Sequence, residues 1–275
     1  MSHRVVFGFG NPPSQMLISL HQRAIFHGVK ALYNYQPINI EGFYLDKCIG
    51  VLHSANVMGC HFTEPLQVNQ CPWLDNFGSG SQSSGRVNII YKDQQLLVGE
   101  DTLHSGSLRA LQRSGFQPEG ARVLLLGSSL EAQSIVRSLA LTGISQLLIL
   151  HSSVDRIRVL ASGMKRDNPD LSVMIGNLQS ENLQDIMERI DLMILAIDID
   201  DPVVRAILPA RLRLGEEITI IDLFASRQPF WEERDELRIL TAQSLLLWQY
   251  AECFRLWNNF DLPRELLTTD EYSPS

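Results

Sequence analysis

The sequence lacks the features that mark membrane-spanning, secreted and metal-binding proteins. No apolar run approaches the roughly 18 residues of a membrane-spanning helix, and the first residues have neither the apolar core nor the cleavage site of a signal peptide. The four cysteines, Cys48, Cys60, Cys71 and Cys253, form no CxxC pair. We therefore expect thiols of a reducing cytoplasm, no metal site and no membrane partner.

Positive charge is also scarce. The chain has 23 lysines and arginines against 31 aspartates and glutamates, which gives a net charge of −8. Nucleic-acid binding needs clustered basic residues, so this balance argues against a nucleic-acid partner. Hydrophobic residues make up 45% of the 275 residues and charged residues 20%, which is typical of a globular protein with one large or two modest domains.

What the chain does contain is a repeated strand–helix pattern. In its second half, apolar runs alternate with amphipathic segments, which predicts an α/β fold with a parallel, doubly wound sheet. The strands expected there are Val123–Leu126, Leu147–Leu150, Val173–Ile175, Leu192–Ile197 and Ile218–Leu223, with helices at Val154–Met164, Leu183–Ile190 and, at the end, Ala242–Asn258.

The first half has a less regular pattern. Its expected strands are Val5–Phe9, Ala31–Ile38 and Val57–Phe62, with helices around Met16–Ile25, at Phe43–Leu52 and at Leu108–Ser114. We expect a flexible loop at Gly78–Gly85 and a hairpin at Val87–Val98 that turns around Lys92–Gln94. The polar tail Thr268–Ser275 is expected to be disordered.

These elements predict a division into domains. We place an α/β domain at residues 1–102, a nucleotide-fold domain at 103–238, and a C-terminal segment at 239–275 whose helix folds back across the first domain. A cleft between two domains is the default site for a small-molecule ligand.

The segment Val123–Ala132, VLLLGSSLEA, has the strand–turn–helix form of a dinucleotide-binding unit. Only Gly127 of the glycine set is present. At the positions of Leu130 and Glu131, a dinucleotide-binding site has a backbone without bulky side chains and a positive electrostatic field. An acid in the first helical turn also has a plain structural role, because it favours the helix dipole.

Several short motifs occur in the order found in one family. His61–Gln67 (HFTEPLQ) corresponds to the family motif N-V-T-x-P-x-K, and Val87–Ile89 corresponds to V-N-T. Gly99–Gly106 corresponds to G-x-N-T-D-x-x-G, and Leu245–Trp257 corresponds to the C-terminal motif. The chain thereby resembles the shikimate dehydrogenases over nearly its whole length. The resemblance implies a substrate domain, a Rossmann domain that binds NADP, and a returning C-terminal helix.

The resemblance also assigns the substrate site. Thr63, Asn88 and Gln249 stand at ligand-binding positions, although Asn88 and Gln249 can equally serve hydrogen bonds within the fold. Gln15 and Leu17 replace the two serines that hold the substrate carboxylate.

The catalytic pair of the family is replaced in this chain. Gln67 stands at the lysine that donates a proton, and a glutamine cannot transfer one near neutral pH. Leu103 stands at the paired aspartate. We take His61, His104 and Asp101 as candidate acid or base groups for a different step. The structural alternatives are packing for the two histidines and, for Asp101, capping of a helix that begins near Thr102.

The cofactor site departs from the family as well. Gly127, Ser128 and Ser129 occupy the phosphate loop, and Ser152 occupies the position of the arginine that holds the 2′-phosphate of NADP. Side chains at 129 and 130 obstruct the approach of a pyrophosphate. We therefore expect either no cofactor or NAD(P) held through Gly127 and backbone amides.

These replacements lead to one main hypothesis and two alternatives. The main hypothesis is a divergent shikimate dehydrogenase-like enzyme or binding protein that has lost dehydroshikimate reduction and takes another polar metabolite. The first alternative is an NAD(P)-dependent oxidoreductase that acts on a different substrate. The second is a non-catalytic scaffold or regulatory protein. The sequence leaves the substrate open, and also whether the chain forms a homodimer.

Overall fold

A computed structural model describes residues 4–10, 12–41, 50–63, 66, 73–178, 189–197, 218–224 and 238–267. The chain divides into two compact units. The first consists of Met1–Gly106 together with Leu246–Ser275, and the second of Ser107–Leu245. Over the residues described, no helix is long and apolar enough to cross a membrane. Three predictions lie wholly or partly outside these residues: the tail at 268–275, most of the helix predicted at Leu183–Ile190, and residues 43–49 of the helix predicted at Phe43–Leu52.

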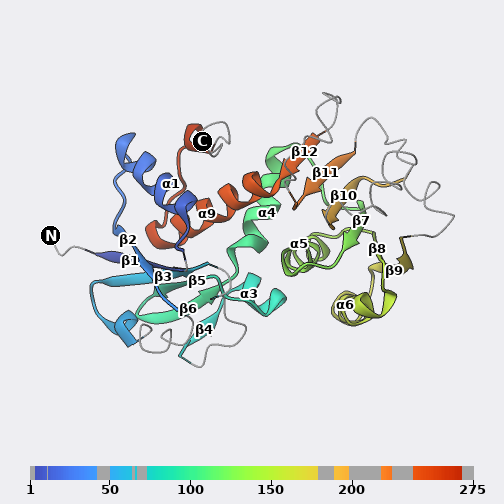
Figure 1. The fold of residues 1–275 in the computed structure, drawn as a ribbon, viewed down its shortest axis with the longest axis horizontal. Coiled ribbons are helices and arrows are strands. Elements are labelled where there is room, and N and C mark those ends of the chain that lie inside the picture. Colours follow the sequence, from blue (N-terminus) through green and yellow to red (C-terminus); the bar gives the residue numbers. More distant parts are fainter. Residues whose placement is uncertain are drawn as a thin grey trace. The chain divides into compact units, whose positions relative to one another are not determined.

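The first unit is built on a mixed six-stranded sheet (Figure 1). Its strands are β1 (Val5–Gly10), β2 (Asn34–Asn39), β3 (Val57–Phe62), β4 (Asn76–Phe77), β5 (Ile89–Asp93) and β6 (Leu96–Glu100), in the order β2-β1-β3-β5-β6-β4. β1 pairs in parallel with β2 and β3, whereas β5 runs antiparallel to β3 and β6. The predicted hairpin is therefore confirmed, although its turn lies at Gln94 and Gln95, which have positive φ angles of 51° and 87°.

Both faces of this sheet are covered by apolar side chains. Ile89 and Ile90 belong to two different core clusters because neighbouring residues of a strand point to opposite faces. The Ile89 cluster includes residues of α1 (Gln15–Phe26) and α9 (Ala242–Asn258), and Trp257 of α9 donates a hydrogen bond to the carbonyl of Ile90 (3.2 Å). The C-terminal helix thus returns to the first unit, as predicted.

The segment Gly78–Gly85 contains a helix, α3 (Ser79–Ser84), so the predicted flexible loop is wrong. Contacts from elsewhere in the chain hold this glycine- and serine-rich turn. The Ser81 amide donates to the Glu100 carboxylate (3.0 Å), and the Ser81 hydroxyl donates to the carbonyl of Arg86 (2.6 Å). Gly85 closes the helix with a φ of 74°, a left-handed conformation that glycine adopts without strain.

The helix predicted at Leu108–Ser114 is part of the longer helix α4 (Thr102–Arg113), which begins at the residue expected if Asp101 is its cap. Asp101 accounts for the early start, because its carboxylate accepts the amide of Leu103 (3.1 Å), as an N-cap does. Gly106 lets α4 lie close to α9: a Cβ at this position would stand 2.7 Å from the Cα of Gln249. The predicted end before Gly115, whose φ is 86°, is confirmed.

The second unit has a parallel sheet flanked by helices (Figure 1). Its elements are β7 (Arg122–Gly127), α5 (Leu130–Ala140), β8 (Gln146–His151), α6 (Val154–Asp167), β9 (Ser172–Asn177), β10 (Leu192–Ala196), β11 (Thr219–Asp222) and β12 (Arg238–Thr241). The order β12-β11-β10-β7-β8-β9 is that of a dinucleotide-binding Rossmann domain. The predicted doubly wound fold is confirmed, with β12 as a strand that the sequence pattern did not predict.

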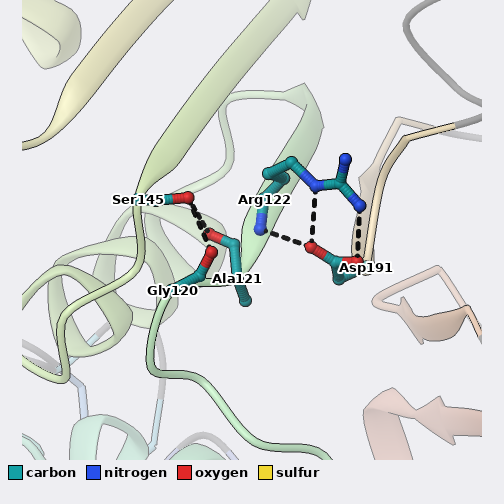
Figure 2. Close-up of polar contacts among 5 residues, drawn as sticks. All are labelled: Gly120, Ala121, Arg122, Ser145 and Asp191. Atoms are coloured by element: carbon teal, nitrogen blue, oxygen red, sulfur yellow. Dashed lines mark hydrogen bonds and ion pairs between the residues drawn. The ribbon is translucent and has the colours of Figure 1, made fainter.

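The amino-terminal edge of this sheet is fixed by polar contacts between β7 and its neighbours (Figure 2). The Arg122 guanidinium donates to both carboxylate oxygens of Asp191, at 3.0 and 2.9 Å, and the Arg122 amide donates to the same carboxylate at 2.8 Å. These hydrogen bonds lower the pKa of Asp191. On the other side, the Ser145 hydroxyl donates to the carbonyl of Gly120 (2.6 Å). The register of β7 between β10 and β8 is therefore held at the edge opposite Gly127.

Candidate functional site

Asn88 lies in a buried polar group in the first unit. Its side chain is bonded to Thr102 in three ways: the Asn88 amide donates to Thr102 Oγ1 (3.0 Å), and the Thr102 amide and hydroxyl donate to Asn88 Oδ1 (3.0 and 3.2 Å). Thr102 Oγ1 also lies 3.3 Å from Cys253 Sγ of α9. Burial raises the pKa of the Cys253 thiol, so this sulfur is a neutral packing group.

Acidic side chains surround the start of α4. Asp101 is 2% exposed and caps the helix, while Glu100 accepts the amides of Asp101 (2.8 Å) and Ser81 (3.0 Å). Burial raises the pKa of Glu100, against the opposing effect of these hydrogen bonds. His104 is 6% exposed; burial lowers its pKa, and the charge of Asp101 acts in the opposite direction.

His61 is 1% exposed and lies among aromatic residues. Its ring stands edge-on to that of Tyr250, with 5.3 Å between the ring centroids. Burial lowers the pKa of His61 to about 3, so the side chain is neutral at pH 7. The Tyr250 hydroxyl in turn accepts a hydrogen bond from Ser14 (2.6 Å), the N-cap of α1.

The remaining substrate-site candidates are spread over several elements of the first unit. The Thr63 hydroxyl donates to the carbonyl of Pro12 (3.2 Å), Gln15 is exposed on α1, and Gln249 is 7% exposed on α9. Leu17 belongs to the hydrophobic core. Gln67 lies outside the described residues.

Gly127 ends β7 in the second unit, at the point where the strand order reverses between β7 and β10. Its φ is 100°, and a Cβ there would stand 2.7 Å from Ile197 Cγ1 and press on the carbonyl of Ala196. The glycine is therefore required by the packing of β7 against β10. In doubly wound sheets this reversal point is also where ligands bind.

The turn after Gly127 uses its polar groups within the fold. The Ser129 hydroxyl accepts the amide of Ala132 (3.3 Å) and so caps α5, and the carbonyl of Ser128 accepts the side chain of Gln133 (3.0 Å). Leu130 is 57% exposed, and Glu131 lies in the first turn of α5. An apolar and an acidic side chain thus occupy the first turn of α5.

Ser152 is exposed beyond the end of β8, with its hydroxyl 3.5 Å from His151 Nδ1. The same nitrogen accepts the amide of Ser153 (2.9 Å), which fixes the ring. Burial, aided by the charge of Arg156, lowers the pKa of His151.

No cluster of three or more histidine, cysteine or acidic side chains suited to a metal ion occurs among the residues that the structure describes.

Known proteins are similar to this chain in both sequence and fold. The chain is 28% identical over 192 residues to the shikimate dehydrogenase (NADP(+)) of Geobacter sulfurreducens, which covers 70% of this chain and 67% of that protein. It is 23% identical over 269 residues to the enzyme of the same name from Desulforamulus reducens, which covers 94% and 91%. The chain is thus similar in sequence to the shikimate dehydrogenases over most of its length. No family model matches it.

Solved structures have a similar fold. The shikimate 5-dehydrogenase of Listeria monocytogenes in complex with shikimate and NAD has a TM-score of 0.82 at 19% identity, over 96% of this chain and 95% of that one. The ligand-free 5-ketofructose reductase of Gluconobacter sp. strain CHM43 has a TM-score of 0.80 at 18% identity, over 96% of both chains. The fold of shikimate dehydrogenases therefore extends over nearly the entire chain.

Sequence reasoning missed the aromatic hydroxyls beside His61. Tyr250 of α9 packs edge-on against this histidine, and Ser14 binds Tyr250 across 236 positions of sequence. Tyr35 of β2 reaches over Gly8, the residue that is paired with His61. The position of Tyr250 next to Gln249 in the C-terminal motif was the available signal. No local pattern pointed to Tyr35.

Proposed function

We propose that this shikimate dehydrogenase homologue binds a small polar metabolite in its first unit and has lost dehydroshikimate reduction. The observation that carries the proposal is Leu103, which stands at the position of the family's catalytic aspartate and is 7% exposed. Its side chain has no atom that can hold or transfer a proton. A lysine at position 67 would also have no carboxylate partner at 103, which fits the presence of Gln67 there.

Asp101 and His61 do not replace the missing pair. The Asp101 carboxylate is engaged in capping α4 through the Leu103 amide. His61 is neutral at pH 7 and packed against Tyr250, so it can form a hydrogen bond but carries no charge. These features favour ligand binding, or a reaction without hydride transfer, over reduction of a carbonyl.

Polar groups suited to a ligand remain in the first unit. Asn88 uses one amide hydrogen for Thr102, which leaves its second amide hydrogen for a ligand oxygen. Thr63 and Gln249 add a hydroxyl and an amide at the positions that the resemblance assigns to substrate binding. One protein of this fold is named 5-ketofructose reductase, so the fold by itself does not fix the substrate.

On this proposal, the second unit is poorly suited to binding a dinucleotide. A pyrophosphate needs open backbone amides and a positive field at the start of α5. Here the Ser129 hydroxyl holds the Ala132 amide, Leu130 is exposed in the first turn, and Glu131 adds a negative charge. We therefore assign no reaction step to NAD(P).

The competing function is an NAD(P)-dependent oxidoreductase that acts on a different substrate. It is favoured by the Rossmann strand order and by Gly127 at its reversal point. On this view the cofactor is held by backbone amides.

Two titrations separate these functions. The purified full-length chain is titrated with NADPH and NADH, with nicotinamide fluorescence and melting temperature as readouts, and is then assayed for shikimate oxidation with NADP+ and NAD+. The Geobacter sulfurreducens relative is the positive control. We expect no saturable cofactor binding and no turnover. Tight cofactor binding without shikimate turnover supports the competing function, whereas shikimate turnover refutes the proposal.

A gain-of-function variant extends this test. The double substitution Gln67→Lys with Leu103→Asp restores the residue types of the family pair. We expect no shikimate oxidation from it, because Gln15, Leu17 and Glu131 still depart from the family pattern. Robust oxidation by the double variant would mean that the substrate and cofactor sites are intact and that only the proton-transfer pair was lost.

A further inference from the structure

The four edge strands of the two described sheets differ in how well they are protected against pairing with another chain. Edge strands in native proteins are usually kept short, or they carry a charged residue or a proline. β4 has two residues, and β12 has four and begins with Arg238. β9 has six residues, Ser172–Asn177 (SVMIGN), without a charge or a proline, and it lies at the edge of the parallel sheet (Figure 1). By composition, β9 is therefore a strand that can pair further.

The fourth edge strand, β2, is as long as β9 but is blocked on its outer side. The Asn34 amide donates to the carbonyl of Arg4 (2.9 Å), so the even-numbered residues of β2 bond to β1 and the odd-numbered residues direct their backbone groups outward. Among these outward groups, the Tyr35 amide donates to His21 Nε2 (3.4 Å), and Pro37 has no amide hydrogen. Another strand would therefore find few donors along β2.

The outer side of β9 carries backbone groups that β8 does not use. The Ser172 amide donates to the carbonyl of Ser145 (3.2 Å), which shows that the even-numbered residues of β9 direct their amides and carbonyls toward β8. The amides and carbonyls of Val173 and Ile175 therefore point away from β8. Within the described part of the chain β9 pairs with β8 alone, so no strand there takes up these groups. Val173 and Ile175 thus present two amides and two carbonyls to a further strand.

The residue order of β9 matches a second copy of itself in antiparallel pairing. About a two-fold axis at Met174, Val173 of one copy stands opposite Ile175 of the other, and Ser172 stands opposite Gly176. Apolar residues thereby face apolar residues, and small residues face small ones. Val173 and Ile175 also meet as a hydrogen-bonded pair, which agrees with the outward direction of their backbone groups.

The exposure of Met174 favours this register over its neighbour. Met174 is 46% exposed, although Leu148, its partner on β8, is 5% exposed. In the pairing about Met174 the two methionines form a non-hydrogen-bonded pair, in which side chains lie closest, so each covers the other. An axis at Ile175 also suits the backbone, but it would place Met174 opposite Gly176, which has no side chain to cover it.

We propose that the protein forms a two-fold symmetric dimer in which β9 of one copy pairs antiparallel with β9 of the other, centred on Met174. The two parallel sheets then form one continuous sheet. Such an interface is closed, because both copies use the same strand and leave no further β9 edge for a third chain. This inference concerns the second unit and is independent of what the first unit binds.

Charged substitutions at Met174 test the dimer, because the axis places this residue opposite itself. Sedimentation equilibrium of the full-length chain at micromolar concentrations should show a monomer–dimer equilibrium. Met174→Lys, and separately Met174→Glu, should raise the dissociation constant at least about tenfold, because two like charges would stand opposite each other. An equimolar mixture of the two variants should form a mixed dimer, since opposite charges then meet. Val159→Lys, at an 82% exposed residue of α6, adds the same charge to the same unit and should leave the dissociation constant unchanged.

Oxidative cross-linking tests the register, with the parent chain as the blank for the native cysteines. Met174→Cys should form a disulfide between copies, because the Cα atoms of such a pair lie about 4.5 Å apart. Ile175→Cys should not, because it stands opposite Val173 of the other copy. If circular dichroism shows that a charged variant is unfolded, the cross-linking decides. A parent chain that stays monomeric, a dimer that Met174→Lys does not weaken, charged variants that stay monomeric when mixed, or a disulfide from Ile175→Cys and none from Met174→Cys would each overturn the inference.

Discussion

Gly127 gives the sharpest test of how the second unit is held together. Substitution by alanine has two separate costs. An L-residue at a φ of 100° pays a backbone penalty of about 1–2 kcal/mol. Its Cβ would also stand 2.7 Å from the carbonyl carbon of Ala196 and from Ile197 Cγ1, and overpacking of this kind costs about 1–3 kcal/mol. We expect Gly127→Ala to lower the free energy of unfolding by about 2–5 kcal/mol.

Gly120 is the matched control for this substitution. Its φ is 74°, also in the left-handed region, but no atom lies within 4 Å of the position of its Cβ. Gly120→Ala should therefore show the backbone penalty alone, about 1–2 kcal/mol. Urea unfolding followed by circular dichroism measures both variants against the parent chain. Equal losses for the two variants would refute the contact between Gly127 and β10 as a source of strain.

Three further predictions concern other contacts. Gly106→Ala should lower the free energy of unfolding by about 1–3 kcal/mol, because the new Cβ would press on the backbone of Gln249. An unchanged urea midpoint would contradict the close approach of α4 and α9. Arg122 and Asp191 form a half-exposed ion pair, and a double-mutant cycle on them should give a coupling free energy of about 0.2–1 kcal/mol that becomes smaller in high salt. A coupling free energy that does not change with salt would contradict an ionic origin. Burial lowers the pKa of His61 from 6.5 to about 3. Between pH 6.5 and about pH 3 the unfolded chain therefore binds a proton at this residue that the folded chain does not. The free energy of unfolding falls as the pH is lowered through this range. His61→Phe should remove up to about 1.4 kcal/mol per pH unit of that slope in urea titrations, and an unaltered slope would contradict it.

The sequence predicted those elements whose own residues determine them. The helix α9 begins and ends at the predicted residues, Ala242 and Asn258, because its apolar pattern runs without interruption between them. The strand β7 was recognisable because Val123–Leu126 is apolar throughout and Gly127 breaks the run. Periodicity within the segment is sufficient in both cases.

Features without an apolar pattern of their own, or that depend on strand pairing, were harder to predict. The first turn of α4 contains polar residues and Gly106, so the helix pattern is absent until Leu108 although the structure begins at Thr102. Asp101 was recognised in the sequence as a helix-capping candidate, and the structure shows it in that role. The reach of Tyr35 over Gly8 depends on strand pairing, which a sequence pattern does not contain.

The helix α3 has a practical consequence for protein engineering. Its sequence, Ser79–Ser84 between two glycines, has the composition of a designed flexible linker, and it would be a natural choice for inserting a tag or opening the chain by circular permutation. In the folded protein the Ser81 amide is held by Glu100, the residue next to the Asp101 cap of α4. An insertion there would release the half-buried carboxylate of Glu100 beside the start of α4, so the apparent linker is a poor insertion point.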